Sequence, residues 1–487
     1  MVAGRKRPGG VSGASAIVWF REDLRLTDNP ALAAAVQSGA KLVGLFVLDE
    51  ESPGIRPRGG ASRWWLHGSL AALARALEAR GASLVLRRGP ATTVLPVIAG
   101  EASARAVFWN RRYGAAEREV DAKVAEALAA ADFAVEVFGA KLLHEPSELR
   151  TKGGVAFLVF TPFWNAAQSI PPPSPLPSPD CIGAADSPRS DQLESWDLLP
   201  RHPDWAAGLR EIWRPGEEGA IERLERFLDQ GFSRYAEERD FPSLESTSRL
   251  SPHLAFGEIG PRQIWAATDR LGRAAPVESL RKLRSELGWR EFAWHLLFHN
   301  PDFATKNFVS SFDAFRWAEP GAALTAWQQG RTGYPIVDAA MRQLWRTGWM
   351  HNRLRLVAGS FLVKHLLIDW RHGEAWFWDT LVDADPANNA VGWQWIAGSG
   401  ADPAPYFRIF NPVLQGQKFD AEGEFIRRFV PELGALPAPH IHAPWKAPAA
   451  VLSAADVRLG ETYPHPIVEH GMARARALAA FAAMRAV

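Results

Sequence analysis

The sequence predicts two domains of different class: an α/β N-terminal domain of the Rossmann type with a parallel sheet, followed by an all-α C-terminal domain. Up to about residue 145, short apolar runs alternate with alanine-rich stretches, which is typical of strands joined by helices. Beyond residue 220 the apolar residues recur with helical spacing, without the alternation of a strand. We therefore expect a disordered tail at 1–15, an α/β domain at 16–145, a linker at 146–215 and a helical domain at 216–487.

The individual elements follow from the same patterns. The predicted strands are AIVWF at 16–20, KLVGLFVL at 41–48, SLVL at 83–86 and AVFW at 106–109, with helices at 63–79 and 116–130 between them. The segment IPPPSPLPSP at 170–179 predicts an extended linker, because proline lacks the backbone N–H that helices and central strands need. Later helices are predicted at 220–230, 279–298, 334–347 and 353–369.

Composition excludes several classes of protein. The single cysteine, Cys181, excludes a disulfide within one chain and a metal site built from cysteines, and it fits a reducing cytoplasm. No apolar run reaches the roughly 18 residues that a membrane span requires, so we expect no membrane association. His295 and His299 have the spacing of metal ligands, but no third ligand accompanies them and no metal is expected. The chain contains 21 tryptophans, most of which we expect in the core, while some are candidates for stacking on a ligand or for electron transfer.

One helix predicts a pocket. Glu286, Trp289, Arg290 and Ala293 share a face by their spacing, and a carboxylate beside an indole on an inward face is costly unless a polar ligand uses it. A cavity that stacks and hydrogen-bonds a nucleobase needs both groups. The alternative is an ordinary amphipathic helix with a buried Trp and a surface Glu, which this helix alone favours.

Three other segments carry candidate site residues, and the one at 381–395 is too polar for a core helix. TGWMHNRLRL at 347–356 and LVDADPANNAVGWQW at 381–395 place carboxylates and amides where a ribose, an adenine amino group or a ring N–H can bind. TSRLS at 247–251 combines hydroxyls with an arginine before a helix, which suits a phosphate, although an ordinary helix cap fits equally well.

These segments, taken together, resemble the photolyase/cryptochrome family. The matching stretches are WFREDLRLTDNPAL at 19–32, TSRLSPHLAFGEI at 247–259, ELGWREF at 286–292, GYPIVDAAMRQLWRTGWMHNRLRL at 333–356, FLVKHLLIDWRHGE at 361–374, DADPANNAVGWQW at 383–395 and APYFRIFNPVLQGQKFD at 404–420. They follow the family's order over nearly the whole chain. The resemblance implies an antenna domain followed by a helical domain that binds FAD.

The resemblance also assigns residues to the cofactor. Its cofactor-binding positions are Tyr235, Thr247, Ser248, Arg249, Leu250, Ser251, Glu286, Arg290, Asn352, Asp383, Asp385 and Asn389, with Asn352 matched to the asparagine that faces flavin N5. Catalytic roles fall to Glu286, Asn352 and a chain of three tryptophans that photoreduces the flavin, Trp393, Trp370 and Trp317. An antenna pigment is also implied, methenyltetrahydrofolate in preference to 8-hydroxydeazaflavin.

The implied substrate is a pyrimidine dimer in UV-damaged DNA, flipped into a pocket. The positions matched to this pocket and to DNA phosphates are Glu286, Trp289, Asn352, Arg353, Leu356, Trp395, Arg408 and Lys418. We expect a cytoplasmic monomer that repairs cyclobutane dimers by electron transfer and joins the nucleoid on binding DNA. The rivals are a cryptochrome photoreceptor and a (6-4) photolyase. Asn352 argues against the first, and the lack of a histidine pair at 350–353 argues against the second.

Three positions depart from the family pattern. Leu356 stands where dimer photolyases carry methionine, which keeps the apolar volume and loses a sulfur contact. His365 stands where relatives carry aspartate, so an ion pair between this position and Arg355 is expected to be lost. In the antenna domain, Asn110 and Tyr113 fit the family's NRxY pattern, but Gly114 replaces a glutamate.

Overall fold

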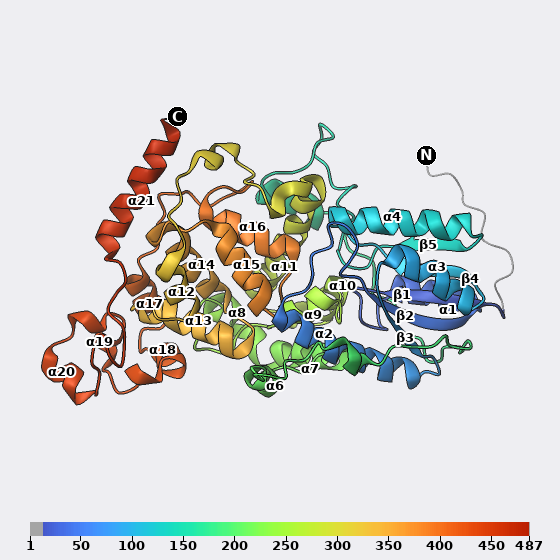
Figure 1. The fold of residues 1–487 in the computed structure, drawn as a ribbon, viewed down its shortest axis with the longest axis horizontal. Coiled ribbons are helices and arrows are strands. Elements are labelled where there is room, and N and C mark those ends of the chain that lie inside the picture. Colours follow the sequence, from blue (N-terminus) through green and yellow to red (C-terminus); the bar gives the residue numbers. More distant parts are fainter. Residues whose placement is uncertain (1–12, 487) are drawn as a thin grey trace.

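A five-stranded parallel sheet forms the centre of the N-terminal half, as predicted (Figure 1). The computed structural model describes residues 13–486. The strands are β1 (Ser15–Phe20), β2 (Lys41–Leu48), β3 (Leu84–Arg88), β4 (Ala104–Asn110) and β5 (Ala134–Phe138), in the order β3-β2-β1-β4-β5. The expected tail at 1–15 lies mostly outside the described residues, but Ser15 already belongs to β1. The edge strand β5 was not predicted.

Helices cover both faces of this sheet. They are α1 (Pro30–Gln37), α2 (Gly60–Glu78), α3 (Ala91–Glu101) and α4 (Ala115–Ala130). Alternate residues of β1 divide between two cores: Val18 and Phe20 pack with residues of α1 and α2, whereas Ile17 and Trp19 pack with residues of α3 and α4. Burial on both faces explains why the strands are continuous apolar runs.

The linker is only partly extended. It contains the helices α5 (Phe160–Gln168) and α6 (Ala207–Ile212), which the proline-based prediction missed. Between them the chain runs back along the sheet domain, where the backbone of Leu42 donates to Gly183 at 2.7 Å and that of Asp191 donates to Leu86 at 2.9 Å. The linker therefore straps the N-terminal domain as well as connecting it to the next one.

The C-terminal half is helical, as predicted, and none of its described residues belongs to a strand of a sheet. Its helices are α7 (Glu217–Arg226), α8 (Tyr235–Glu238), α9 (Ser251–Phe256), α10 (Pro261–Asp269), α11 (Val277–His299), α12 (Gly321–Gln328), α13 (Pro335–Thr347), α14 (Asn352–Ser360), α15 (Trp370–Thr380), α16 (Pro386–Ala397), α17 (Pro412–Phe419), α18 (Glu424–Phe429), α19 (Ala438–Ile441), α20 (Ala449–Ala454) and α21 (His470–Arg485). The predicted helix at 353–369 is shorter, because α14 passes into a π-turn at Phe361–His365. None of the described helices has the length and apolar character needed to cross a bilayer.

A buried carboxylate joins the two halves. Glu258, which follows α9, is fully buried and accepts hydrogen bonds from Trp65 Nε1 at 3.0 Å, from Ser69 Oγ and from the backbone of Gly216 at 2.6 Å. Trp65 and Ser69 lie on α2 of the N-terminal half. Buried polar networks of this kind, with their members satisfied, fix one docking geometry.

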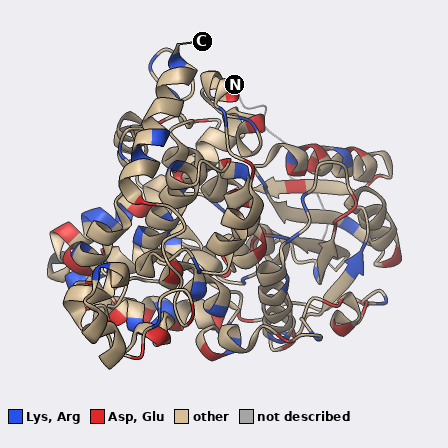
Figure 2. Ribbon diagram, turned by 60° about the vertical axis from the view of Figure 1, so that its left-hand side comes forward, with Lys and Arg blue, Asp and Glu red and all other residues tan. Residues whose placement is uncertain are grey.

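Charge is spread over the whole molecule. Lysine and arginine alternate with aspartate and glutamate over both halves, and neither sign collects on one half (Figure 2). This distribution agrees with the formal net charge of +1. Attraction for a polyanion must therefore come from a local group of cations, since the molecule as a whole provides little.

Candidate functional site

Helix α11 presents Glu286 at the rim of the site. Its carboxylate lies 2.6 Å from the guanidinium of Arg239, and the Glu286 side chain is 36% exposed. The Arg239 guanidinium also lies over the ring of Tyr235, at 5.3 Å from the centroid. Burial, and then the charge of Glu286, raises the pKa of the Tyr235 phenol, so this group stays protonated and can donate a hydrogen bond.

Trp289, the next predicted pocket residue on α11, has one face covered. The ring of Phe160, at the start of α5, stacks on it with centroids 3.7 Å apart and planes 7° from parallel. The backbone of Phe160 donates to Asp402 at 3.0 Å, which ties α5 to the loop beyond α16. Because the indole remains only half-buried, its ring can still contact a ligand.

Arg290 is engaged mainly by the protein. Its guanidinium donates to the backbone oxygens of Lys141 at 2.9 Å and Leu254 at 3.4 Å, and it is 9% exposed. These contacts place Arg290 at the junction of the two halves. A role in binding the cofactor stays a prediction.

The segment 247–251 forms a turn against Trp349. Arg249 has a φ of 50°, its guanidinium lies 5.1 Å from the Trp349 ring centroid, and it donates to Glu245 at 2.7 Å. Trp349 Nε1 donates to the Ser251 hydroxyl at 3.2 Å. The positive charge and the hydroxyls predicted as a cradle therefore lie on one turn, and Ser251 begins α9.

Helices α14 and α16 form the opposite wall. Arg355 donates to Asp383 Oδ2 at 2.7 Å, so this guanidinium has an ion pair although residue 365 is not an aspartate. The partner is Asp383 rather than residue 365; His365 instead lies 2.9 Å from His470 Nδ1. Asp383 is 7% exposed, and its other oxygen, Oδ1, is buried without a partner among the described residues.

The two cofactor candidates on α16 differ in how their polar atoms are used. Asp385 caps the helix by accepting from the backbone of Ala387 at 3.0 Å and of Asn388 at 2.8 Å. Asn389 is buried and donates through Nδ2 to the backbone oxygen of Glu374 at 3.0 Å and to its Oε1 at 2.8 Å. Asn352, in contrast, is exposed at the first position of α14.

Orphaned polar atoms indicate that this wall fits a bound cofactor. Buried polar groups almost always have partners, and each exception needs an explanation. Asp383 Oδ1 and Trp393 Nε1 are both buried without one among the described residues. A ligand with polar edges, such as FAD, supplies the missing partners, and these two residues with Asn389 and the 247–251 turn are the groups that would hold it.

Two of the three predicted chain tryptophans are buried, and the third is half-buried. Trp393 and Trp370 are 2% and 0% exposed, Trp317 is half-buried, and all three belong to one apolar cluster. The ring of Trp393 lies against Gly373, one turn from Trp370 on α15, so closely that a Cβ at 373 would be 2.6 Å from Trp393 Cζ3. This gradient from interior to surface suits a route for electrons.

The predicted phosphate contacts lie on an exposed rim. Arg408 and Lys418 are exposed, whereas Arg353 already pairs with Asp240 at 2.7 Å and packs over Phe419 at 4.5 Å. Leu356 and Trp395 are half-buried and pack against the main core of the helical half. Sequence reasoning missed Phe407, a phenyl ring 65% exposed next to Arg408; its place in the APYFRIF motif was the available signal.

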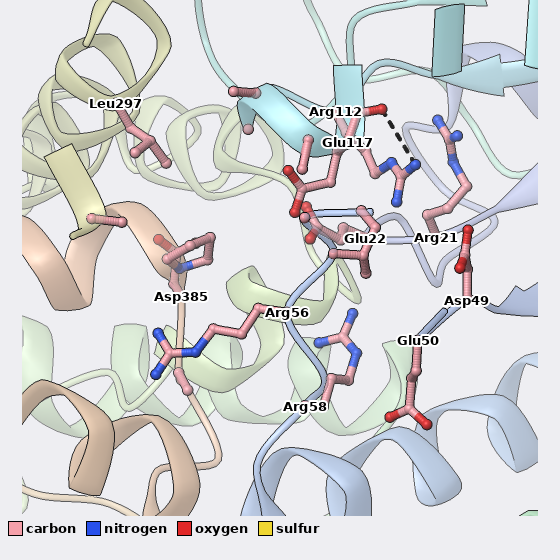
Figure 3. A pocket seen from close by; sticks show the side chains of 18 of the residues that line it. Arg21, Glu22, Asp49, Glu50, Arg56, Arg58, Arg112, Glu117, Leu297 and Asp385 are labelled. Carbon is pink, nitrogen blue, oxygen red and sulfur yellow. Dashed lines mark hydrogen bonds between the residues drawn. The ribbon is translucent and has the colours of Figure 1, made fainter. Parts of the chain in front are cut away.

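A cavity of about 500 Å³ lies between the two halves, and no sequence pattern indicated its outline (Figure 3). Its walls carry cations from both halves alongside carboxylates, namely Arg21, Arg56, Arg58, Arg112, Lys141 and Arg371 with Glu22, Asp49, Glu50, Glu117, Glu374 and Asp385. Two indoles, Trp19 and Trp378, also line it. Burial alone would raise the pKa of Glu22, but Lys141, Arg58 and Arg112 outweigh it and lower the pKa to about 2. The cavity is therefore charged, aromatic and of the size of small-molecule sites.

Asn110 and Tyr113, the residues of the NRxY pattern, hold this region together through hydrogen bonds. Asn110 is buried and donates to Asp23 at 2.6 Å and Asn29 at 2.7 Å, and the Tyr113 hydroxyl donates to Glu145 at 2.9 Å. At Gly114, the space that a Cβ would need is filled by the carboxylate of Glu117. The carboxylate expected at position 114 is thus replaced by one from the first turn of α4.

Comparison with known proteins agrees with this arrangement. A family model described as DNA photolyase matches residues 16–180, and one described as the FAD binding domain of DNA photolyase matches residues 283–483. The chain is 52% identical to the deoxyribodipyrimidine photo-lyase of Agrobacterium fabrum, over 97% of this chain and 98% of that one, and 40% identical to Cryptochrome-1 of Arabidopsis thaliana, over 96% of this chain and 70% of that one.

Solved structures give the same result. A class III photolyase from Agrobacterium tumefaciens superposes with a TM-score of 0.95 at 50% identity, covering 99% of both chains. A Synechocystis cryptochrome superposes with a TM-score of 0.85 at 28% identity, covering 96% of this chain and 99% of that one. The predicted family, fold and FAD-binding domain are confirmed: the chain belongs to the DNA photolyase family.

Proposed function

We propose that this chain is a deoxyribodipyrimidine photolyase that repairs cyclobutane pyrimidine dimers in DNA in the light. The observation that supports this proposal is that the helices of the cofactor wall pack on each other and on the helix that carries the half-buried Trp289. Helix α16, which begins after its capping residue Asp385 and carries Trp393, packs against both α11 and α14. The Agrobacterium fabrum relative is named for a deoxyribodipyrimidine, which agrees with this class of substrate.

In this proposal FAD, when bound and reduced, supplies the light-driven electron that splits the dimer. The chain's own residues bind the damaged DNA and orient the flipped bases. Trp289 and Trp395 pack on the flipped bases. The exposed Arg408 and Lys418 bind phosphates. Arg353 adds a phosphate contact through the guanidinium N–H groups that do not bond to Asp240. The lesion weakens stacking and pairing, which lowers the cost of flipping it out.

The pairing of Glu286 with Arg239 defines what this part of the rim offers. A carboxylate accepts hydrogen bonds, and a guanidinium donates them. The pair therefore presents both functions to the imide edge of a pyrimidine, which carries an N–H between two carbonyls. As negative charge develops on the base, the donor from Arg239 stabilises a carbonyl oxygen while Glu286 holds the ring N–H, with both groups already in place.

The test is illumination of purified protein, with its flavin fully reduced, in the presence of DNA that contains defined lesions. We expect about one FAD per chain and blue-light repair of cyclobutane dimers. Binding of FAD without repair of any lesion would favour the photoreceptor alternative, to which the 40% identical Cryptochrome-1 points. Repair of (6-4) lesions alone would retain the fold and cofactor and overturn the substrate.

For the cavity between the two halves we propose a folate antenna, methenyltetrahydrofolate rather than 8-hydroxydeazaflavin. Carboxylates such as Glu117 suit the amino and N–H edge of a pterin, while Arg58 and Arg112 suit the carboxylates of a glutamate tail. A deazaflavin has no carboxylate for these cations. Reconstitution of the purified protein with each pigment tests this proposal. Arg58→Ala should weaken folate binding. Arg105→Ala, at an exposed position outside the cavity, is the control and should not weaken it.

We further propose a monomer that works in the cytoplasm and collects on the nucleoid when it binds DNA. The single exposed cysteine, Cys181, fits a reducing compartment. Sedimentation of the purified protein gives its mass in solution, and imaging of a fluorescent fusion before and after UV exposure gives its location. A stable dimer in solution would contradict the proposed monomer. A fusion that stays diffuse in the cell after UV exposure would contradict the proposed association with the nucleoid.

A further inference from the structure

The hydrogen bonds of Asn389 determine which of its side-chain atoms can meet a ligand. A primary amide has two N–H donors and one carbonyl acceptor. In this structure both partners of Asn389 Nδ2 are oxygens of Glu374, the backbone oxygen at 3.0 Å and Oε1 at 2.8 Å. Since both partners accept, the amide cannot be turned over without losing both bonds. Asn389 can therefore offer a bound cofactor only its carbonyl oxygen.

Glu374 is itself held in place from the other half of the molecule. Its side chain is 7% exposed, and Arg56 contacts it with both guanidinium nitrogens, Nη1 to Oε1 at 2.7 Å and Nη2 to Oε2 at 3.1 Å. A bidentate contact fixes the direction of the carboxylate as well as its position. A buried carboxylate that loses its cation is strongly destabilised, so Arg56 is the group that holds Glu374 in this orientation.

Arg56 is in turn anchored against helix α15. Its guanidinium lies 4.1 Å from the ring centroid of Trp378, whose Nε1 donates to the backbone oxygen of Pro57 at 2.9 Å. The backbone of Gly60 donates to Asp379 at 2.8 Å. The segment that carries Arg56 thus packs along the same helix that carries Glu374, and Figure 3 shows Arg56 reaching across the cavity from the N-terminal half.

From these contacts we propose that Arg56 and Glu374 are positioning residues, which together fix Asn389 as a hydrogen-bond acceptor toward FAD. The proposal rests on the placement of Asn389 beside the flavin. A flavin ring gains N–H groups when it is reduced and protonated, so a fixed acceptor favours the reduced form over the oxidised one. A residue of the N-terminal half thereby contributes to the reduction potential of a cofactor bound in the helical half.

The test is the midpoint potential of bound FAD in matched variants, each checked for FAD content and thermal unfolding. Arg56 is 41% exposed, so Arg56→Ala should still fold. Loss of one oriented hydrogen bond should reduce the preference for reduced flavin by about two- to tenfold, and tenfold corresponds to about 59 mV for one electron. Arg56→Lys should recover part of the shift, and Glu374→Ala should show the full effect.

Arg118→Ala is the matched control. Arg118 also reaches from the N-terminal half to the helical half, where it packs over Phe298 at 4.3 Å and donates to its backbone oxygen at 3.5 Å, rather than bonding to α15. It should leave the potential unchanged. Asn389→Ala separates two kinds of failure. If Asn389→Ala shifts the potential while Arg56→Ala matches the wild type, the positioning role is wrong. If neither variant shifts it, the placement of Asn389 beside the flavin is wrong and the inference falls with it.

Discussion

The stack of Phe160 on Trp289 predicts a selective loss of binding to damaged DNA. With centroids 3.7 Å apart and planes 7° from parallel, Phe160 fixes the tilt of the indole and leaves one face for a base. Stacking of a base on an aromatic ring contributes about 1–3 kcal/mol, so Trp289→Ala should weaken dimer binding by roughly 5- to 150-fold. An aromatic pair contributes about 0.5–1.5 kcal/mol, so Phe160→Leu should weaken it by roughly two- to twelvefold.

The assay is titration of dimer-containing and undamaged duplexes in the dark, for both single variants and the double variant. Because Phe160 acts through Trp289, the double variant should bind no more weakly than Trp289→Ala alone. Phe163→Leu is the control: it makes the same change on the same helix, and Phe163 packs against Phe157, Phe292 and His295 rather than Trp289. Equal losses for damaged and undamaged DNA, or strictly additive losses, would refute the reasoning.

Three further predictions concern electron supply, DNA and pH. Trp393→Phe should abolish rapid photoreduction of oxidised flavin yet largely spare repair after chemical reduction, whereas Trp109→Phe in the N-terminal sheet should change neither; normal photoreduction in Trp393→Phe would contradict the route. Arg408→Ala or Lys418→Ala should each lower the salt dependence of DNA binding by about one unit of slope, and an unchanged slope removes that residue from the rim. Burial lowers the pKa of His351 to about 4 from 6.5, so the folded protein excludes a proton that the unfolded chain binds. The contribution of this group to the free energy of unfolding should therefore be full above about pH 6.5 and should fall as the pH drops toward 4. Urea unfolding across this pH range measures the effect, and His351→Gln should flatten the dependence.

Much of the fold could be predicted because it depends on local patterns. The strands β1 to β4 are buried on both faces and appear as unbroken apolar runs, and the long helices keep their apolar spacing. Strand β5 was missed because its sequence, AVEVF, is short, lies at the edge of the sheet and is only half-buried. Helix α5 was missed because it contains Pro162 and lies directly before the proline-rich segment 170–179, so both were assigned to one linker.

The site was predictable only where its residues share one segment. Asp383, Asp385 and Asn389 lie in one polar and aromatic stretch that no core would contain. The partners that determine their behaviour come from elsewhere: Arg355 from α14 for Asp383, and Glu374 from α15 for Asn389. Arg56 lies in a surface-like sequence, IRPRGG, and Phe160 in the linker, and no periodicity connects either residue to the site. Contacts between distant segments depend on domain docking, which one sequence does not display.

The buried carboxylate of Glu258 has a consequence for anyone who divides this protein into fragments. The two family matches end at residue 180 and begin again at residue 283, which leaves Glu258 in neither. A fragment cut at residue 180 would lose Gly183 and Asp191, which bond the edges of strands β2 and β3, and would expose Trp65 and Ser69 without their acceptor. Fragments limited to the two family matches would therefore not be self-sufficient modules. Two longer fragments, divided within the exposed segment at 201–204, each keep the whole surface that contacts the other fragment. Such pieces should recover flavin binding only when they are produced together, so the molecule could serve as a split reporter for the association of two fused proteins.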